Sequence, residues 1–402
     1  MFVGITNRPR PYAWGSRTAI ADLLGWEPSG GPEAELWLGA HPGSPSRIVD
    51  PAATGGAADL AAWIAADPSV ALGPDARSAR LPFLLKLLAA GSPLSLQAHP
   101  TAAQAREGFR RENEAGVPLD APHRNYRDEH PKPELIYALS ERFEALCGFR
   151  TLAEFRQIVA VLRRRATPGA QVVPLDALLE LAASDDALPD VVEWLSRGGD
   201  NVDAVVDLVA DLAARRPAPG EDGQFDTAFA TTVDLAAEYP GDPGIMVSLL
   251  LNRVSLRRGE ALYLPAGNIH AYLSGLGVEL MAASDNVLRG GLTPKHVDVP
   301  ELMNVLDFTP RAVPVLAPER PSPGLEVYRP TAPDFVLVRF GGGAQATFPL
   351  QGPAIAICTR GSVALSGASS IRLDRGSAVY ITPDEGEITL SGDGEVFVAT
   401  SG

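Results

Sequence analysis

Cysteine is nearly absent from this sequence: among 402 residues only Cys147 and Cys358 are present. Two thiols cannot form a disulfide framework, and they exclude a zinc site made mainly of thiolates. Long apolar segments are missing as well. No run approaches the length needed to cross a bilayer, and residues 1–11 hold Arg8 and Arg10 but no apolar signal region. These absences predict a cytoplasmic protein that has no membrane partner.

Lysine is also scarce, since only Lys86, Lys132 and Lys295 occur among 34 basic residues. A coding preference for arginine explains the scarcity, but it does not explain why each lysine lies close to a candidate site residue named below. The formal net charge is −15. A charge of this sign repels polyanions, and no basic face for nucleic acid is visible. A small phosphorylated ligand can still bind where a few cations converge on its phosphate.

The spacing of apolar residues divides the chain into parts. Residues 1–148 read as short strands and turns, whereas residues 149–241 show the periodicity of helices, with a Pro- and Gly-rich break at Arg216–Gly223 before the last one. Strands return over residues 242–312, where Val247–Leu251 is a short apolar run. We therefore expect 149–241 to be a helical domain inserted into a β domain formed by the flanking segments.

Residues 313–402 read as strands and turns to the end, which is typical of a sandwich or barrel. A turn pattern occurs in both β parts. The first copy ends in a histidine and consists of Gly259, Pro265, Gly267 and His270. The second copy has no histidine and consists of Gly376, Pro383 and Gly386. The first resembles the second signature motif of cupin jelly rolls, except that Ser274 stands where that motif has Asn. We predict a mainly β protein with an α insertion: two cupin-like jelly rolls plus a helical domain, with no metal in the C-terminal roll.

Two segments place polar side chains on one face. In Pro93–Pro100, read as a strand, the period of two puts Ser95, Gln97 and His99 together. A solvated strand face is the simpler alternative for such a pattern. In the segment His130-Pro-Lys-Pro-Glu134, Lys132 and Glu134 share a face of an extended chain, although a surface turn carrying a charge pair would look the same.

Further candidates follow near the end of the first β part. His270 comes after a Gly-Asn turn, and Glu279 would point away from its two apolar neighbours. Asp285 and Arg289 lie four residues apart, so a helical salt bridge between them is the structural alternative. Gln97, His99, Glu134 and His270 together offer two imidazole nitrogens and two oxygens. Such a set suits zinc with an open position, although manganese, iron or cobalt could use it too.

Several segments occur in the order found in type I mannose-6-phosphate isomerases, and the chain resembles that family of the cupin superfamily from about residue 10 to 310. The segments are Tyr12–Gly15, Ala34–Pro42, Leu96–Pro100, Pro131–Glu134, Gly267–Tyr272 and Ser284–Arg289. The resemblance implies zinc ligands at Gln97, His99, Glu134 and His270 and a catalytic arginine at Arg289. It also implies two jelly rolls with an inserted helical domain. The commoner bacterial form Gln-Val-His-Pro-Asp is altered at Ala98 and Thr101, outside the ligand positions.

The resemblance implies an isomerase that interconverts D-mannose 6-phosphate and D-fructose 6-phosphate through a metal-stabilised enediol. We expect one Zn²⁺ per chain, a monomer, and a role in supplying mannose phosphate, as for GDP-mannose biosynthesis. Lys132 is the expected acid/base group, with Glu279 and Asp285 as competing bases. The expected contacts to substrate hydroxyls, phosphate and pocket walls are Ser95, Lys86, Lys295, Tyr272 and Trp14. The alternatives are an isomerase of another aldose phosphate, a metal cupin with oxygen chemistry, and a non-catalytic sugar-binding cupin.

Overall fold

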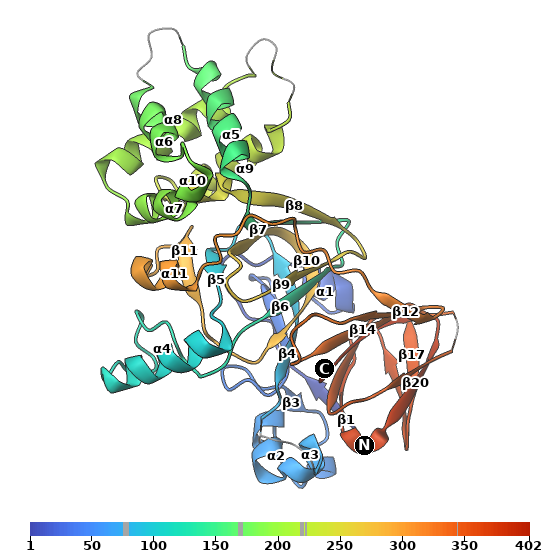
Figure 1. Ribbon diagram of the computed structural model, residues 1–402. Helices are drawn as coiled ribbons and strands as arrows, with labels where there is room; N and C mark the ends of the chain where they lie inside the picture. Colours follow the sequence, from blue (N-terminus) through green and yellow to red (C-terminus); the bar gives the residue numbers. More distant parts are fainter. Residues whose placement is uncertain (75–79, 168–171, 218–220, 222, 344) are drawn as a thin grey trace.

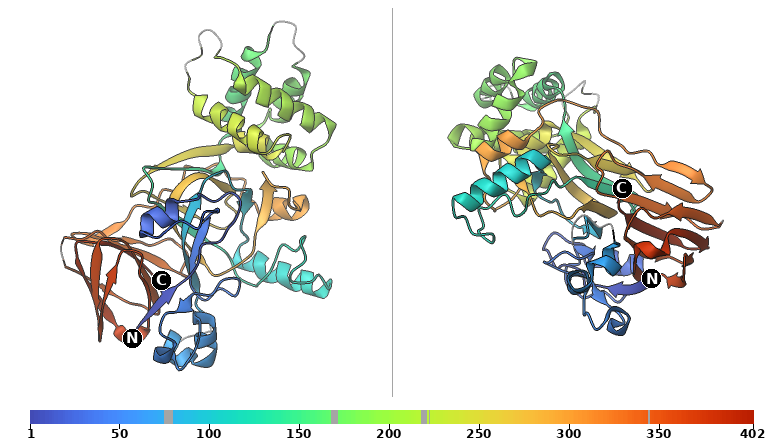
Figure 2. Two further views of the ribbon diagram at one scale, coloured as in Figure 1. Left: turned by 180° about the vertical axis from the view of Figure 1, so that it is seen from behind. Right: turned by 60° about the horizontal axis from the view of Figure 1, so that its bottom comes forward.

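A computed structural model describes residues 1–74, 80–167, 172–217, 221, 223–343 and 345–402 (Figure 1). Within these ranges the strands form antiparallel sheets of nine, eight and four strands. The helices that follow β7 gather at one end of the molecule and the C-terminal strands at the other, with the long strand β10 between them (Figures 1 and 2). The predicted mainly β fold with helices is confirmed.

The nine-stranded sheet is built around one long strand, β10. Its members are β2 (Glu35–Leu38), β4 (Phe83–Ala90), β5 (Leu96–Ala98), β6 (Glu134–Ala138), β7 (Arg142–Phe149), β8 (Leu251–Arg257), β9 (Ala261–Leu264), β10 (His270–Ala282) and β11 (Leu288–Gly291). The first half of β10 pairs with β5 and β7, and the second half with β4 and β6. Gly275 lies between the halves with φ +123°, and a Cβ there would lie 2.9 Å from Phe143 Cα. Glycine therefore permits the change of partners.

The C-terminal strands form two further sheets. The eight-stranded sheet holds β12 (Glu319–Ser322), β13 (Leu325–Tyr328), β14 (Val336–Phe340), β16 (Ala354–Arg360), β19 (Ala378–Ile381), β21 (Glu395–Thr400), β1 (Phe2–Thr6) and β3 (Arg47–Ile48). The four-stranded sheet holds β15 (Ala346–Pro349), β17 (Ser362–Ser366), β18 (Ser370–Asp374) and β20 (Glu387–Gly392). One apolar core includes Phe340, Leu365 and Leu390 from both sheets. The sequence reading grouped β1 and β3 with residues 1–148, but they pair within the sheet of the C-terminal strands.

The first five α-helices after β7 are amphipathic and share one core. They are α5 (Leu152–Arg165), α6 (Val173–Leu181), α7 (Leu188–Arg197), α8 (Asp200–Ala214) and α9 (Asp226–Glu238). The predicted break at Arg216–Gly223 falls partly outside the described residues, since 218–220 and 222 are not among them. The other helices are α1 (Ala19–Leu24), α2 (Leu60–Ala66), α3 (Pro68–Leu72), α4 (Ala102–Glu114), α10 (Gly244–Leu249) and α11 (Val299–Val305), with 3-10 turns at Pro51–Thr54, Asp185–Ala187 and Pro383–Glu385. None of the helices in the described ranges is long and apolar enough to cross a bilayer.

The reading of Val247–Leu251 as part of the returning strands is wrong. Gly244–Leu249 forms helix α10, and the strand β8 begins only at Leu251. Every residue of α10 is buried, so the helix has no polar face to give a 3.6-residue period. A short run that is apolar on all sides cannot be distinguished from a buried strand by its pattern, and only packing decides it.

Candidate active site and metal centre

The register of the central sheet brings the site residues into neighbouring rows. On one edge, Gln97 of β5 pairs with His270 of β10 on one side and with Arg289 of β11 on the other. Further along β10, Glu279 pairs with Lys86 of β4. Residues that are far apart in sequence thus lie side by side because directly paired positions in antiparallel strands are within about 5.5 Å.

His99, Glu134 and His270 form a compact cluster, which His270 joins to the row that contains Gln97. Their potential ligand atoms all lie within 4.8 Å of one another, and all three residues are buried. The Nε2 atom of each histidine lies 3.2 Å from a carboxylate oxygen of Glu134. Neither Nε2 atom, nor Oε2 of Glu134, has a hydrogen-bond partner among the described residues. Buried polar atoms without partners are rare, and a bound cation would satisfy all three at once.

Backbone carbonyls orient both imidazole rings of this cluster. Nδ1 of His99 lies 2.8 Å from the carbonyl oxygen of Asn286, and Nδ1 of His270 lies 3.1 Å from that of Asn268. A carbonyl can only accept, so each Nδ1 carries the proton and each Nε2 presents its lone pair to the centre of the cluster. This tautomer is the one that binds a metal.

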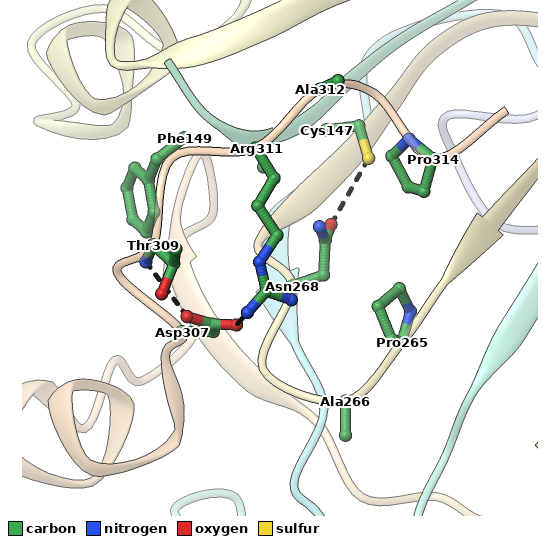
Figure 3. Close-up of a pocket in the computed structure, with 11 residues that line it drawn as sticks. Cys147, Phe149, Pro265, Ala266, Asn268, Asp307, Thr309, Arg311, Ala312 and Pro314 are labelled. Atoms are coloured by element: carbon green, nitrogen blue, oxygen red, sulfur yellow. Dashed lines mark hydrogen bonds and ion pairs between the residues drawn. The ribbon is translucent and has the colours of Figure 1, made fainter. Parts of the chain in front are cut away.

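A cavity of about 90 Å³ is lined by Pro265, Ala266 and Asn268, from the segment that precedes His270 in the chain (Figure 3). In it the Cys147 thiol donates to Oδ1 of Asn268 at 3.4 Å, and the Asp307 carboxylate pairs with Arg311 at 2.9 Å (Figure 3). Burial raises the pKa of Cys147 to about 12. The thiol is therefore protonated at neutral pH and supports the segment that carries His270 rather than acting as a nucleophile.

A larger pocket of about 650 Å³ borders the cluster at Glu134. All of the predicted site residues except His99 and His270 line it: Trp14, Lys86, Ser95, Gln97, Lys132, Glu134, Tyr272, Glu279, Asp285, Arg289 and Lys295. The two histidines contact Glu134, which borders both the pocket and the cluster. The structure therefore brings the predicted site residues together in one place.

Buried charges form the inner wall of this pocket. The Lys86 ammonium lies 2.8 Å from Glu279 and 3.4 Å from Glu35. Burial alone would lower the pKa of Lys86, but these carboxylates outweigh it and raise the pKa. Burial, assisted by Glu279, raises the pKa of the Tyr272 hydroxyl well above its usual value. The Lys132 ammonium lies 3.0 Å from Glu134, which belongs to the cluster of two histidines and a glutamate.

Three cations that line the pocket lie close enough to repel one another: Arg127, Arg289 and Lys295. Burial, and to a lesser extent repulsion from Arg127, lowers the pKa of Arg289. Burial, and to a lesser extent repulsion from both arginines, lowers the pKa of Lys295. In the described part of the chain, none of the three forms an ion pair with a carboxylate. Like charges held together without a counter-ion are arranged to receive an anion.

Asp285 does not pair with Arg289, as the helical alternative would require. Its carboxylate lies 3.1 Å from Nε2 of His41. The Gly43 N–H donates to Nδ1 of the same imidazole at 3.1 Å, so Nε2 carries the proton and donates to Asp285. Burial alone would raise the pKa of Asp285, but this hydrogen bond, with the positive charges of Lys132 and Lys86, lowers it. Asp285 thus faces the pocket as a carboxylate.

Sequence reasoning missed several residues of the site. His41 and Glu35 lie in the segment Ala34–Pro42 that carried the resemblance, and that segment was the available signal for them. Arg127 belongs to no such segment. Asn286 is buried and its side chain accepts from the backbone of Arg127 and of Asp128, which ties this loop to the carbonyl that orients His99. Asn286 lies within Ser284–Arg289, so the resemblance was the available signal for it as well.

Comparisons with known proteins agree over almost the whole chain. Residues 3–152 match the model of the catalytic domain of type I phosphomannose isomerase. The chain is 37% identical to mannose-6-phosphate isomerase of Escherichia coli (strain K12), covering 98% of this chain and 97% of that protein. It is 33% identical to the Homo sapiens enzyme, with 93% and 92% covered.

Solved structures are similar to the same extent. The apo form of mannose 6-phosphate isomerase from Salmonella typhimurium superposes with a TM-score of 0.86 at 31% identity, covering 100% of this chain and 99% of that one. A zinc-bound mannose 6-phosphate isomerase gives a TM-score of 0.85 at 32% identity, with the same coverage. The extent of these matches and the ordered motifs lead to one conclusion: the chain belongs to the type I mannose-6-phosphate isomerase family.

Proposed function

We propose that this protein interconverts D-mannose 6-phosphate and D-fructose 6-phosphate. The observation that carries the proposal is that one pocket joins a buried cluster of two histidines and a glutamate to three unpaired cations. The cluster can hold a metal next to the sugar's reactive carbons, and the three cations can hold the phosphate at the other end of the substrate. Membership of the isomerase family supports the same assignment.

The four residues Gln97, His99, Glu134 and His270 would hold one zinc ion per chain. The three partnerless buried atoms support this set, and Gln97 pairs with His270 across the sheet and faces the same pocket. Zinc bound here would polarise the oxygens at C1 and C2 of the open-chain sugar and stabilise the charge of an enediolate.

Residues of the chain itself would move the protons. Lys132, held 3.0 Å from a metal ligand, lies where it can transfer a proton between C1 and C2. Asp285 is half exposed in the pocket and kept ionised by His41, so it suits removal of the ring hydroxyl proton when the sugar opens. Glu279, held by Lys86, would accept a hydrogen bond from a sugar hydroxyl, with Tyr272 beside it.

The three cations would bind the phosphate. Arg127 and Lys295 are exposed at the pocket and Arg289 is half-buried within it. A dianionic phosphate would relieve the repulsion among them, and the forked guanidinium groups match its oxygens in pairs. The Ser95 hydroxyl, two residues before Gln97 and just ahead of β5, would contribute a neutral hydrogen bond.

The proposal also covers architecture and setting. The sheets would represent two cupin-like jelly rolls, a metal-binding one over 1–148 and 242–312 and a metal-free one over 313–402, with 149–241 as an inserted helical domain. The α-helices α5 to α9, which follow one another within the described part of 149–241, support the insertion. A cytoplasmic monomer that supplies mannose phosphate for GDP-mannose is proposed from the sequence alone.

An assay of fructose 6-phosphate formation tests the function. Purified protein is given mannose 6-phosphate, and turnover is coupled to reduction of a nicotinamide nucleotide. We expect turnover that a chelator abolishes and added zinc restores. A protein that turns over glucose 6-phosphate or another aldose phosphate faster would have a different substrate. A protein that binds the sugar phosphate without turnover, in its zinc-loaded form, would be a non-catalytic sugar-binding cupin.

A further inference from the structure

We propose that Asp242 is a positioning residue for phosphate recognition, although it lies outside the pocket. Its carboxylate holds a strained backbone turn at residues 291–293, and this turn places Arg289 and Lys295 so that both reach the same anion. The inference rests on the proposed function, because it assigns the two side chains to the substrate's phosphate.

Both carboxylate oxygens of Asp242 accept backbone hydrogen bonds. Oδ1 accepts from the Gly244 N–H at 2.7 Å and from the Leu292 N–H at 2.9 Å. Oδ2 accepts from the Thr293 N–H at 3.1 Å. The first bond is local, since Gly244 is only two residues after Asp242 and begins the short helix α10, and it uses one oxygen. The other two cross to a turn 50 and 51 positions further along the chain, so the residue connects two distant segments.

The turn that Asp242 holds is strained. Leu292 has φ +55°, and among the described residues it is the one non-glycine residue with positive φ. A leucine in the left-handed region suffers a clash between its Cβ and the backbone, and such a conformation persists only where the surroundings impose it. Here the side chain is buried in the core that α10 also joins, and the N–H is bound by Asp242.

The backbone around the turn is in direct contact with α10. Gly291 has φ +121°, and a Cβ on it would lie 2.7 Å from the Cα of Gly244. Between Arg289 and Gly291 the pairing of β11 with β5 shifts register. An irregularity of this kind redirects the neighbouring side chain, and here that side chain is Arg289, which lines the pocket.

The turn lies between the two cations in the chain, so its conformation sets where Arg289 and Lys295 lie. Leu292 lies three residues after Arg289 and three before Lys295, and these two cations repel each other. Without a bound anion, a free backbone would relax so that the two charges separate. A turn fixed by Asp242 prevents that relaxation, so the cations are already in place when the phosphate arrives.

The test compares Asp242→Ala and Asp242→Asn with a matched control, Asp59→Ala. Asp59 is likewise half-buried and likewise accepts a backbone N–H at the start of a helix, that of Ala62 at 2.8 Å, but neither Asp59 nor α2 contributes to the lining of the pocket. The measurements are KM and kcat for mannose 6-phosphate, inhibition by inorganic phosphate, and zinc content. Misplacing one charge-assisted contact should raise KM and weaken phosphate inhibition about tenfold in Asp242→Ala. Asp242→Asn retains one acceptor oxygen, so it should raise KM and weaken phosphate inhibition by a smaller factor. It provides the same test if the alanine variant does not fold. Zinc content should stay unchanged, and Asp59→Ala should alter none of the three.

A second substitution separates positioning from general stability. Leu292→Gly in the Asp242→Ala background lets the turn adopt positive φ without a clash, so phosphate inhibition should recover in part while the melting temperature falls further. Unchanged KM and unchanged phosphate inhibition in both Asp242 variants, in an enzyme that turns over mannose 6-phosphate, would overturn the inference alone. A wild-type enzyme that turns over mannose 6-phosphate but resists inorganic phosphate would overturn the phosphate site and the role of Asp242 together. Absence of wild-type turnover would instead refute the proposed function.

Discussion

Replacing His270 with alanine should remove both zinc and turnover. His270 supplies one of the two imidazole nitrogens of the cluster, and its Nδ1 is already bound to the Asn268 carbonyl at 3.1 Å. The site is therefore pre-oriented, and no neighbouring histidine can replace the missing ligand. Among the described residues, the histidines, cysteines and carboxylates form this one cluster of metal-binding geometry.

The expected loss of affinity follows from the number of ligands. Zinc bound by four protein ligands has an apparent binding free energy of about 10–16 kcal/mol, so each ligand contributes roughly 3 kcal/mol. A loss of about 3 kcal/mol corresponds to a hundredfold or greater increase in Kd. The Glu134 carboxylate, which the structure places 3.2 Å from both imidazoles, would keep only one of them.

The measurement is zinc content by elemental analysis after dialysis against buffers of fixed free zinc, together with turnover in the same samples. His123→Ala is the matched control, because His123 is exposed and belongs to neither the cluster nor the pocket. We expect the control to bind zinc as the wild type does. Zinc occupancy of His270→Ala equal to that of the wild type, at the free zinc that half-saturates the wild type, would refute the ligand assignment.

Four further predictions follow from the pocket. Arg289→Lys should raise KM and lower kcat/KM about a hundredfold, since a lost bidentate contact to the phosphate costs about 3 kcal/mol, with zinc retained; near-normal kcat/KM would make Arg289 structural. His41→Phe removes the hydrogen bond that lowers the pKa of Asp285, so the acid limb of the kcat/KM profile should move to higher pH, and an unmoved limb would refute that role. Lys86→Met leaves two buried carboxylates unpaired and should destabilise the fold by about 3–5 kcal/mol in denaturant unfolding; an unchanged midpoint would contradict the buried pairing. Conversion in deuterated water should place deuterium at C2 of mannose 6-phosphate or C1 of fructose 6-phosphate, whereas complete retention of hydrogen in active enzyme would indicate a hydride shift and remove the acid/base roles.

Local sequence predicted much of the site because the ligands lie on short, regular segments. The period of two in Pro93–Pro100 placed Gln97 and His99 on one face, and the two prolines around Lys132 predicted an extended approach to Glu134. In the structure these segments do border one pocket and one cluster. Such patterns can be read from the chain because strand geometry relates neighbours two residues apart, whatever lies around them.

Contacts between distant segments could not be read in the same way. The sequence shows His41, Arg127 and Asp242 as ordinary polar residues in loops, and their partners come from other elements brought close by the sheet. For β1 and β3, too, local pattern predicts a strand but not the sheet that the strand joins.

What the sequence by itself determined is the kind of chemistry: the types of the proposed ligands, the short segment that holds two of them, and a set of motifs shared with one isomerase family. Tertiary structure alone decided which charges remain without partners, which carboxylate is kept ionised, and which turn is held in a strained conformation. The physical reason is that ligand type belongs to a residue, whereas pairing, desolvation and strain belong to the surroundings, and those arise only when elements far apart in the chain pack together.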